Sequence, residues 1–153
     1  MSKIAVTIPT HESPNHITGG IEGVAKLIPG KSAAAVAVVT AGSTAKAVGS
    51  GSLDVFATPM MVALMEQAAC NCLADCLEDG QTSVGTDISV AHTAASPIGA
   101  EVTATAAIVL VNGRNVVFEV TASDRAGEIG KGRHTRAIVD AERFTRKTLT
   151  REV

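Results

Sequence analysis

The chain has 153 residues, of which 46% are hydrophobic and 18% are charged, with a formal net charge of −2 at pH 7. This composition is typical of one folded domain with a sizeable core, and it excludes an intrinsically disordered chain. Because there is no basic excess, neither nucleic acid nor an anionic membrane surface is expected as the main partner.

The sequence also indicates the compartment. No stretch approaches the roughly 20 apolar residues that a membrane span needs, and the N-terminus has no signal-peptide pattern. We therefore expect a cytoplasmic protein. Its three cysteines, Cys70, Cys72 and Cys76, lie close together in an odd number, without the spacing of a zinc site. Buried, reduced thiols are the expectation, with no metal and no cofactor.

The N-terminal part of the chain gives few structural signals. Residues 1–30 are interrupted by Pro and Gly and are interpreted as an extension of unknown role. Residues 31–40, "KSAAAVAVVT", predict the first core strand. Residues 41–57 are rich in Gly, Ser and Ala and predict a loop that leads to a helix.

A long buried helix is predicted next. Thr58 is a good N-cap, with Pro59 at the favoured first position. Apolar residues then fill nearly every position to Leu77, and Gly80 is expected to cap the end in a left-handed conformation. The predicted helix has about twenty residues and a length of about 30 Å.

After the helix, the apolar pattern changes to the period of two that strands have. In residues 82–92 one face is predicted to carry the even-numbered residues, which are Thr82, Val84, Thr86, Ile88, Val90 and His92. A second strand, 101–111, is predicted to place five residues in phase, namely Val102, Ala104, Ala106, Ile108 and Leu110.

Two more strands complete the predicted domain. Asn112-Gly113 is a strong hairpin signal and leads to a return strand at 115–123. A last long strand follows "DRAG", and the charged tail, 145–153, is expected to be exposed. The fold class is therefore α+β, with an antiparallel sheet of about five strands around one central helix and a domain spanning 31–144.

Three residues could carry chemistry. Glu66 lies in the apolar run with no Lys or Arg near it on the helix, which suits a general base, or else it lies on one wet stripe beside Gln67. His92 ends a strand on the face that meets the helix, either as an acid/base group or as a core-edge histidine bonded to a carbonyl. Thr58 is either a structural N-cap or a hydroxyl beside the N–H groups that could hold an oxyanion.

Spacing limits how these residues combine. Thr58 and Glu66 are separated by about 12 Å along the helix axis. Either His92 bridges them or one member comes from a second chain. The other histidines, His11, His16 and His134, are expected on the surface or in loops.

The segments "FATPMMVALMEQAA", "SVGTDISVAHTAASPIG", "VNGRNVVFEVTASD" and "GKGRHTRAIVD" together resemble the fluoroacetyl-CoA thioesterase family of hotdog-fold proteins, from about residue 31 to 144. The resemblance implies a homodimer that hydrolyses an acyl-CoA thioester, with CoA entering only as part of the substrate. It places the catalytic residues at Thr58, Glu66 and His92, and substrate-binding residues at Phe56, Gly85 and Arg136.

Two features depart from the family pattern: residues 1–29 have no counterpart in it, and the residues that close the pocket differ. The fluoroacetate-specific member gates its pocket with aromatic residues, whereas this chain offers only Phe56 beside the Ala/Gly/Ser-rich loop 41–55. The sequence therefore favours a different small acyl group. A hotdog enoyl-CoA hydratase and a non-catalytic acyl-CoA binding protein are the alternatives.

Overall fold

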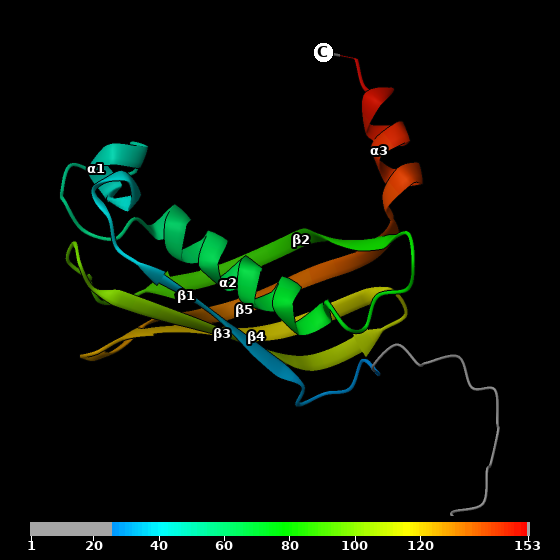
Figure 1. The fold of residues 1–153 in the computed structure, drawn as a ribbon, viewed down its shortest axis with the longest axis horizontal. Helices are drawn as coiled ribbons and strands as arrows, with labels where there is room; N and C mark the ends of the chain where they lie inside the picture. Colours follow the sequence, from blue (N-terminus) through cyan, green and yellow to red (C-terminus); the bar gives the residue numbers. More distant parts are fainter. Residues whose placement is uncertain (1–25, 153) are drawn as a thin grey trace, which may run out of the picture.

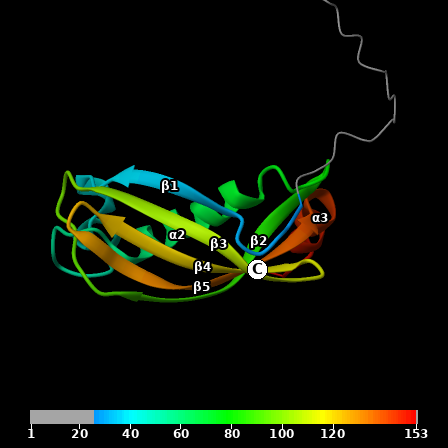
Figure 2. The same ribbon diagram turned by 90° about the horizontal axis from the view of Figure 1, so that it is seen from below.

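The computed structural model describes residues 26–152, which form one curved antiparallel sheet with a long helix lying across one of its faces (Figures 1 and 2). Most of the predicted N-terminal extension lies outside the described residues. The strand order is β1-β3-β4-β5-β2, so β1 and β2 are the two edges. The elements in chain order are β1 Ser32–Val38, η1 Ala41–Ser43, α1 Ala45–Val48, α2 Thr58–Leu73, β2 Gln81–His92, β3 Glu101–Asn112, β4 Asn115–Asp124, β5 Gly127–Asp140 and α3 Ala141–Leu149. This arrangement confirms the α+β prediction.

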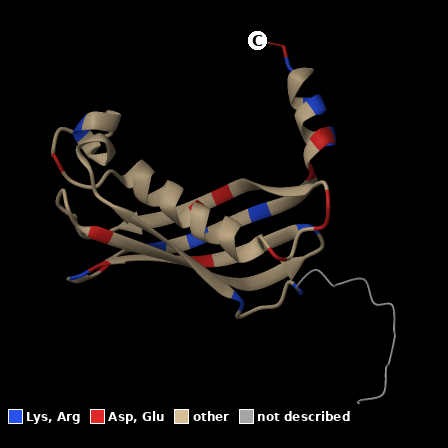
Figure 3. Cartoon of the chain, viewed as in Figure 1, with Lys and Arg blue, Asp and Glu red and all other residues tan. Residues whose placement is uncertain are grey.

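The core lies between α2 and the β1–β3–β4 part of the sheet. Met61 and Met65 of the helix are fully buried there, and burial of each such side chain stabilises the fold by about 1.5–3 kcal/mol. Alanines on the facing strands, such as Ala104 and Ala122, let the helix approach the sheet closely. Glu66 is the one charged residue of α2, and most of this helix is therefore tan in Figure 3. The helix makes few contacts with β2, so α2 covers the β2 part of the inner face less completely.

The limits of α2 differ from the prediction. Thr58 is the first helical residue, and Ala57, with φ −70° and ψ 137°, is the N-cap. The helix ends at Leu73 and has 16 residues. Gly80 does have a positive φ, 80°, but it lies in the turn before β2. The prediction was too long because Cys76, which is 6% exposed, is buried by a turn rather than by a helix.

Two irregularities shift the predicted strand faces. The β2–β5 register changes between Gly85 and Asp87, so Ser83 and Gly85 share the helix-facing side with Ile88, Val90 and His92. The residues Thr82, Val84 and Thr86 therefore do not share one face with His92, as the alternation had predicted. A second register change, after Ile108, leaves Leu110 54% exposed instead of in the core.

The segment before α2 is more ordered than the predicted loop. It contains η1 and α1, and the Thr44 side chain caps α1 by accepting a hydrogen bond from the Ala47 amide. The Phe56 amide donates to the Ser96 carbonyl and the Ala57 amide to the Ser43 carbonyl. These bonds fasten the segment both to the start of α2 and to the loop that follows β2.

The charged C-terminal part is a helix for most of its length. Asp140 caps α3 by accepting a hydrogen bond from the Arg143 amide at 2.7 Å. Figure 1 shows α3 projecting from the end of the sheet. Within residues 26–152, no helix is long and apolar enough to cross a membrane.

Candidate active site

Two of the predicted catalytic residues are in contact. Thr58 opens α2 and His92 closes β2, and Thr58 Oγ1 lies 2.8 Å from His92 Nδ1. When Nε2 of the ring carries the proton, Nδ1 accepts the hydrogen bond from the hydroxyl. The contact thus joins a hydroxyl to a base at the start of the helix.

A small cavity of about 250 Å³ lies beside this pair. Its walls come from α1, from the segment before α2 and from the loop after β2, and they are Ala45, Ser50, Val55, Phe56, Thr58, His92, Thr93, Ala94 and Ala95. His92 Nε2 is buried and has no hydrogen-bond partner within the described part of the chain. Leaving a buried polar nitrogen without a partner costs about 1–3 kcal/mol of folding free energy. Such unpaired groups are found at functional sites.

The start of α2 presents one free donor. Met60 and Met61 both donate their amides to the Ala57 carbonyl, and Pro59 has no amide hydrogen. The Thr58 amide has no described hydrogen bond in residues 26–152. It is therefore the donor through which the positive end of the helix could act on a carbonyl oxygen.

Glu66 belongs to a second group of residues. Arg136 Nη1 donates to Glu66 Oε2 at 3.1 Å, and His134 Nε2 lies 3.8 Å from the same oxygen. The Glu66 side chain is 40% exposed, whereas that of Arg136 is 7% exposed. The carboxylate is therefore paired and half-buried, because β5 supplies the cation that the helix itself lacks.

Gly85 leaves the space that Glu66 occupies. A β-carbon at this position would lie 2.7 Å from Glu66 Oε2 and 3.1 Å from His134 Cε1. Glycine is needed here for close approach rather than for a positive φ. The substrate contacts expected of Gly85 and Arg136 remain predictions.

The two groups of residues are not joined within one chain. Glu66 bonds to β5, whereas His92 bonds to Thr58, and no hydrogen bond or ion pair between Glu66 and His92 is found in the region that the structure describes. The eight residues between Thr58 and Glu66 correspond to about 12 Å along the helix axis.

His134 is the residue that the sequence analysis misplaced. It is 1% exposed, lies on the helix-facing side of β5 and stacks on Phe118 with ring centroids 6.3 Å apart. The expectation of a surface position was wrong. His134, Arg136 and Ile138 are every second residue of β5 and therefore share one face, and this period of two was the signal in the sequence for a buried position. His11 and His16 lie outside the described residues.

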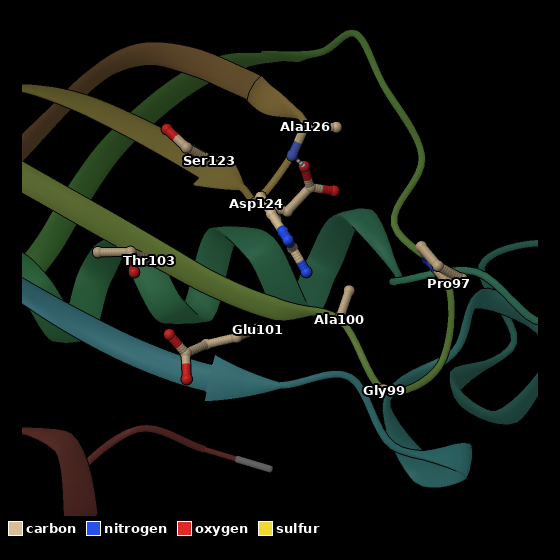
Figure 4. A pocket seen from close by; sticks show the side chains of 9 residues that line it. Pro97, Gly99, Ala100, Glu101, Thr103, Ser123, Asp124 and Ala126 are labelled. Atoms are coloured by element: carbon tan, nitrogen blue, oxygen red, sulfur yellow. Dashed lines mark hydrogen bonds between the residues drawn. The ribbon is translucent and has the colours of Figure 1, made fainter.

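A larger hollow, of about 730 Å³, lies where β3 begins and β4 ends (Figure 4). Its charged residues are Glu101, Asp124 and Arg125, and it contains none of the predicted site residues. The Ser96 hydroxyl and then the Ala126 amide donate to the Asp124 carboxylate and hold its pKa below the ordinary value. With no nucleophile–base pair on its walls, this hollow is not the candidate active site. No group of three or more possible metal ligands occurs among residues 26–152.

Comparison with known proteins gives a consistent family. Residues 39–142 match the family of the fluoroacetyl-CoA-specific thioesterase. A fluoroacetyl-CoA thioesterase from Streptantibioticus cattleyicolor is 48% identical over 94 residues, which are 61% of this chain and 68% of that protein.

The solved structures agree with this match. A fluoroacetyl-CoA thioesterase superposes with a TM-score of 0.79 at 36% identity, covering 84% of this chain and all of that one, and a variant of that enzyme has been solved in complex with acetyl-CoA. A hotdog-like protein from Thermanaerovibrio acidaminovorans gives a TM-score of 0.72 at 25% identity, covering 79% of this chain and 90% of that one. The hotdog fold that the sequence resemblance implied is thereby confirmed.

Proposed function

The chain belongs to the family of the fluoroacetyl-CoA-specific thioesterase, and we propose that it hydrolyses a small acyl-CoA thioester to the free acid and CoA. The observation that carries this proposal is the 2.8 Å contact between Thr58 Oγ1 and His92 Nδ1 on the wall of a cavity at the start of α2. A hydroxyl held by an imidazole at a helix N-terminus suits attack on a carbonyl.

In this mechanism His92 is the base. It takes the proton from the attacking oxygen, which belongs to the Thr58 hydroxyl or to a water that the hydroxyl orients. A C–O bond forms to the thioester carbon, and the Thr58 amide stabilises the negative charge on the carbonyl oxygen. The C–S bond then breaks, and the proton passes to the CoA sulfur. If Thr58 attacks, a water hydrolyses the acyl-threonine in a second round. Positioned acid/base groups of this kind contribute roughly 10²–10⁴ in rate.

A homodimer accounts for Glu66. Among residues 26–152, β2 is a 12-residue edge strand whose one neighbour is β5, and such an edge is a natural site for pairing with a second copy. We infer an antiparallel pairing along β2 whose register sets Gly85, next to which the Glu66 carboxylate lies, opposite the His92 end of the partner strand. Each site would then combine Thr58 and His92 of one subunit with Glu66 of the partner subunit.

The cavity supports a small acyl group. Its walls are mostly Ala, Ser and Val, and Phe56 is the one aromatic residue besides the His92 ring. The relatives are named for fluoroacetyl-CoA. Because loop 41–55 has no aromatic residue to close over so small a group, we do not expect specificity for fluoroacetyl-CoA here.

Glu66→Gln and His92→Ala test the assignment. Both variants should lose release of CoA thiol from short, branched and aryl acyl-CoA substrates while keeping the parental circular dichroism spectrum. Gln67→Ala, on the exposed side of the same helix, is the matched control and should stay active. If both site variants cleave a good substrate at the parental rate, the site assignment is wrong.

The same substrates separate the alternatives. Loss of enoyl absorbance without thiol release would identify a hydratase. Saturable binding of acyl-CoA without any turnover would identify a binding protein. Either result would replace the thioesterase proposal.

A further inference from the structure

We propose that His134 is a positioning residue, which fixes Arg136 and through it the carboxylate of Glu66. The structural part of this inference concerns contacts within one chain. Its catalytic consequence rests on the proposed function, because only then does the place of the Glu66 carboxylate affect turnover.

The hydrogen bonds of His134 define its tautomer. Nδ1 lies 2.8 Å from the Asp87 carbonyl oxygen, which can only accept, so Nδ1 carries a proton. Nε2 lies 3.2 Å from Arg136 Nη1, which can only donate, so Nε2 presents its lone pair. The imidazole is thus a neutral link between the β2 backbone and the arginine on its own strand.

Arg136 is held at every nitrogen. Its Nε donates to Ser83 Oγ at 2.9 Å and its Nη2 to the Ser83 carbonyl at 2.9 Å. Its Nη1 divides two hydrogens between Glu66 Oε2 and His134 Nε2. Because the guanidinium is planar, the two Ser83 bonds set its plane, and the buried His134 bond adds a second acceptor at Nη1, the nitrogen that contacts the carboxylate.

The surroundings leave His134 little freedom. Phe118 stacks on the ring, and Gly85 provides the space in which the ring edge and Glu66 Oε2 meet. The one described hydrogen bond of the carboxylate uses Oε2. Oε1 of this 40% exposed side chain is then available to a substrate or to the partner subunit.

Two amide variants separate the two bonds of the ring. In His134→Gln the amide oxygen can reach the position of Nε2 and accept from Arg136. In His134→Asn the shorter amide can replace only Nδ1 and donate to the Asp87 carbonyl. If His134 acts through Arg136, the Gln variant should keep kcat within about threefold, and the Asn variant should lose roughly ten- to hundredfold in kcat with little change in KM.

A spectroscopic measurement tests the same link without turnover. In ¹⁵N–¹H spectra, the Arg136 Nη1 resonance should keep its parental shift in the Gln variant and should shift and broaden in the Asn variant, because only the Asn variant loses the acceptor at Nη1. Imidazole ¹⁵N shifts should report the Nδ1–H tautomer of His134. If the two variants have equal kcat and the Arg136 resonances do not respond, the inference is overturned. Because the spectra need no substrate, an inactive parental protein would refute the proposed function and leave this inference testable.

Discussion

Gly85→Ala tests how closely the Glu66 group is packed. The added β-carbon would lie 2.7 Å from Glu66 Oε2, so the carboxylate must move by about 0.7 Å to reach ordinary contact at 3.4 Å. The His134 ring, at 3.1 Å, would also have to shift slightly. Since Arg136 is held by Ser83, it cannot follow the carboxylate freely. The substitution should thus lengthen the Glu66–Arg136 hydrogen bond.

We expect two consequences of this displacement. Overpacking of this kind costs about 1–3 kcal/mol of folding free energy. A displacement of this size in a catalytic group lowers turnover by roughly ten- to hundredfold. Urea unfolding measures the first effect, and kcat from release of CoA thiol measures the second.

Gly42→Ala is the matched control, because its β-carbon would meet nothing closer than Thr40 Oγ1 at 3.9 Å and its φ is not positive. This variant should keep parental stability and turnover. If Gly85→Ala also keeps both, the packing argument around Glu66 is refuted.

Three further predictions concern other parts of the fold. Thr58→Ala should abolish turnover. It should change the free energy of unfolding by no more than about 0.5 kcal/mol in a urea titration, because the residue is not the N-cap. A loss near 1 kcal/mol would instead indicate a capping role. Cys70 is exposed, against the expectation of three buried thiols, whereas burial raises the pKa of the Cys72 and Cys76 thiols. A thiol reagent at pH 8 should therefore modify one thiol per native chain and all three only after unfolding, and rapid modification of more than one native thiol would contradict this. The Ser96 hydrogen bond lowers the folded-state pKa of Asp124, so its stabilisation is present above the unfolded value of about 3.9 and is lost as pH falls through the folded value. Ser96→Ala should therefore destabilise the protein at pH 7 more than in strong acid. A difference in unfolding free energy between variant and parent that does not change with pH would contradict the role of this hydrogen bond.

The sequence predicted the features that depend on local pattern. A long apolar run and four later segments with period two were enough for the helix, four of the strands and their antiparallel pairing, but the sheet order, in which β2 lies beside β5, was not predicted. The bulge at Thr86 and the register change after Ile108 were not predictable, because one extra residue in a strand leaves no mark in its composition. The end of α2 was missed for a similar reason, since a buried turn is as apolar as a buried helix.

The site was only partly predictable. Strand alternation placed His92 on the side that faces the helix, but whether it bridges Thr58 and Glu66 was left open, and in the described part of one chain it bonds to Thr58 and not to Glu66. The partner of Glu66 is 70 residues away in the chain, at Arg136, and no local pattern connects the two. Alternation along β5 could have placed His134 on the buried face, whereas its contacts with Phe118 and with the space at Gly85 are tertiary features that the sequence does not show.

The most direct test of the two-subunit site is to mix two inactive variants, Thr58→Ala and Glu66→Gln, under conditions in which subunits exchange. In a mixed dimer, one site would combine an intact Thr58 and His92 with an intact Glu66 of the partner subunit. Random exchange should then restore about a quarter of the parental thiol release, because half of the dimers are mixed and each has one complete site of two. If mixed dimers form by mass spectrometry and the mixture stays inactive, the site is not shared between two chains.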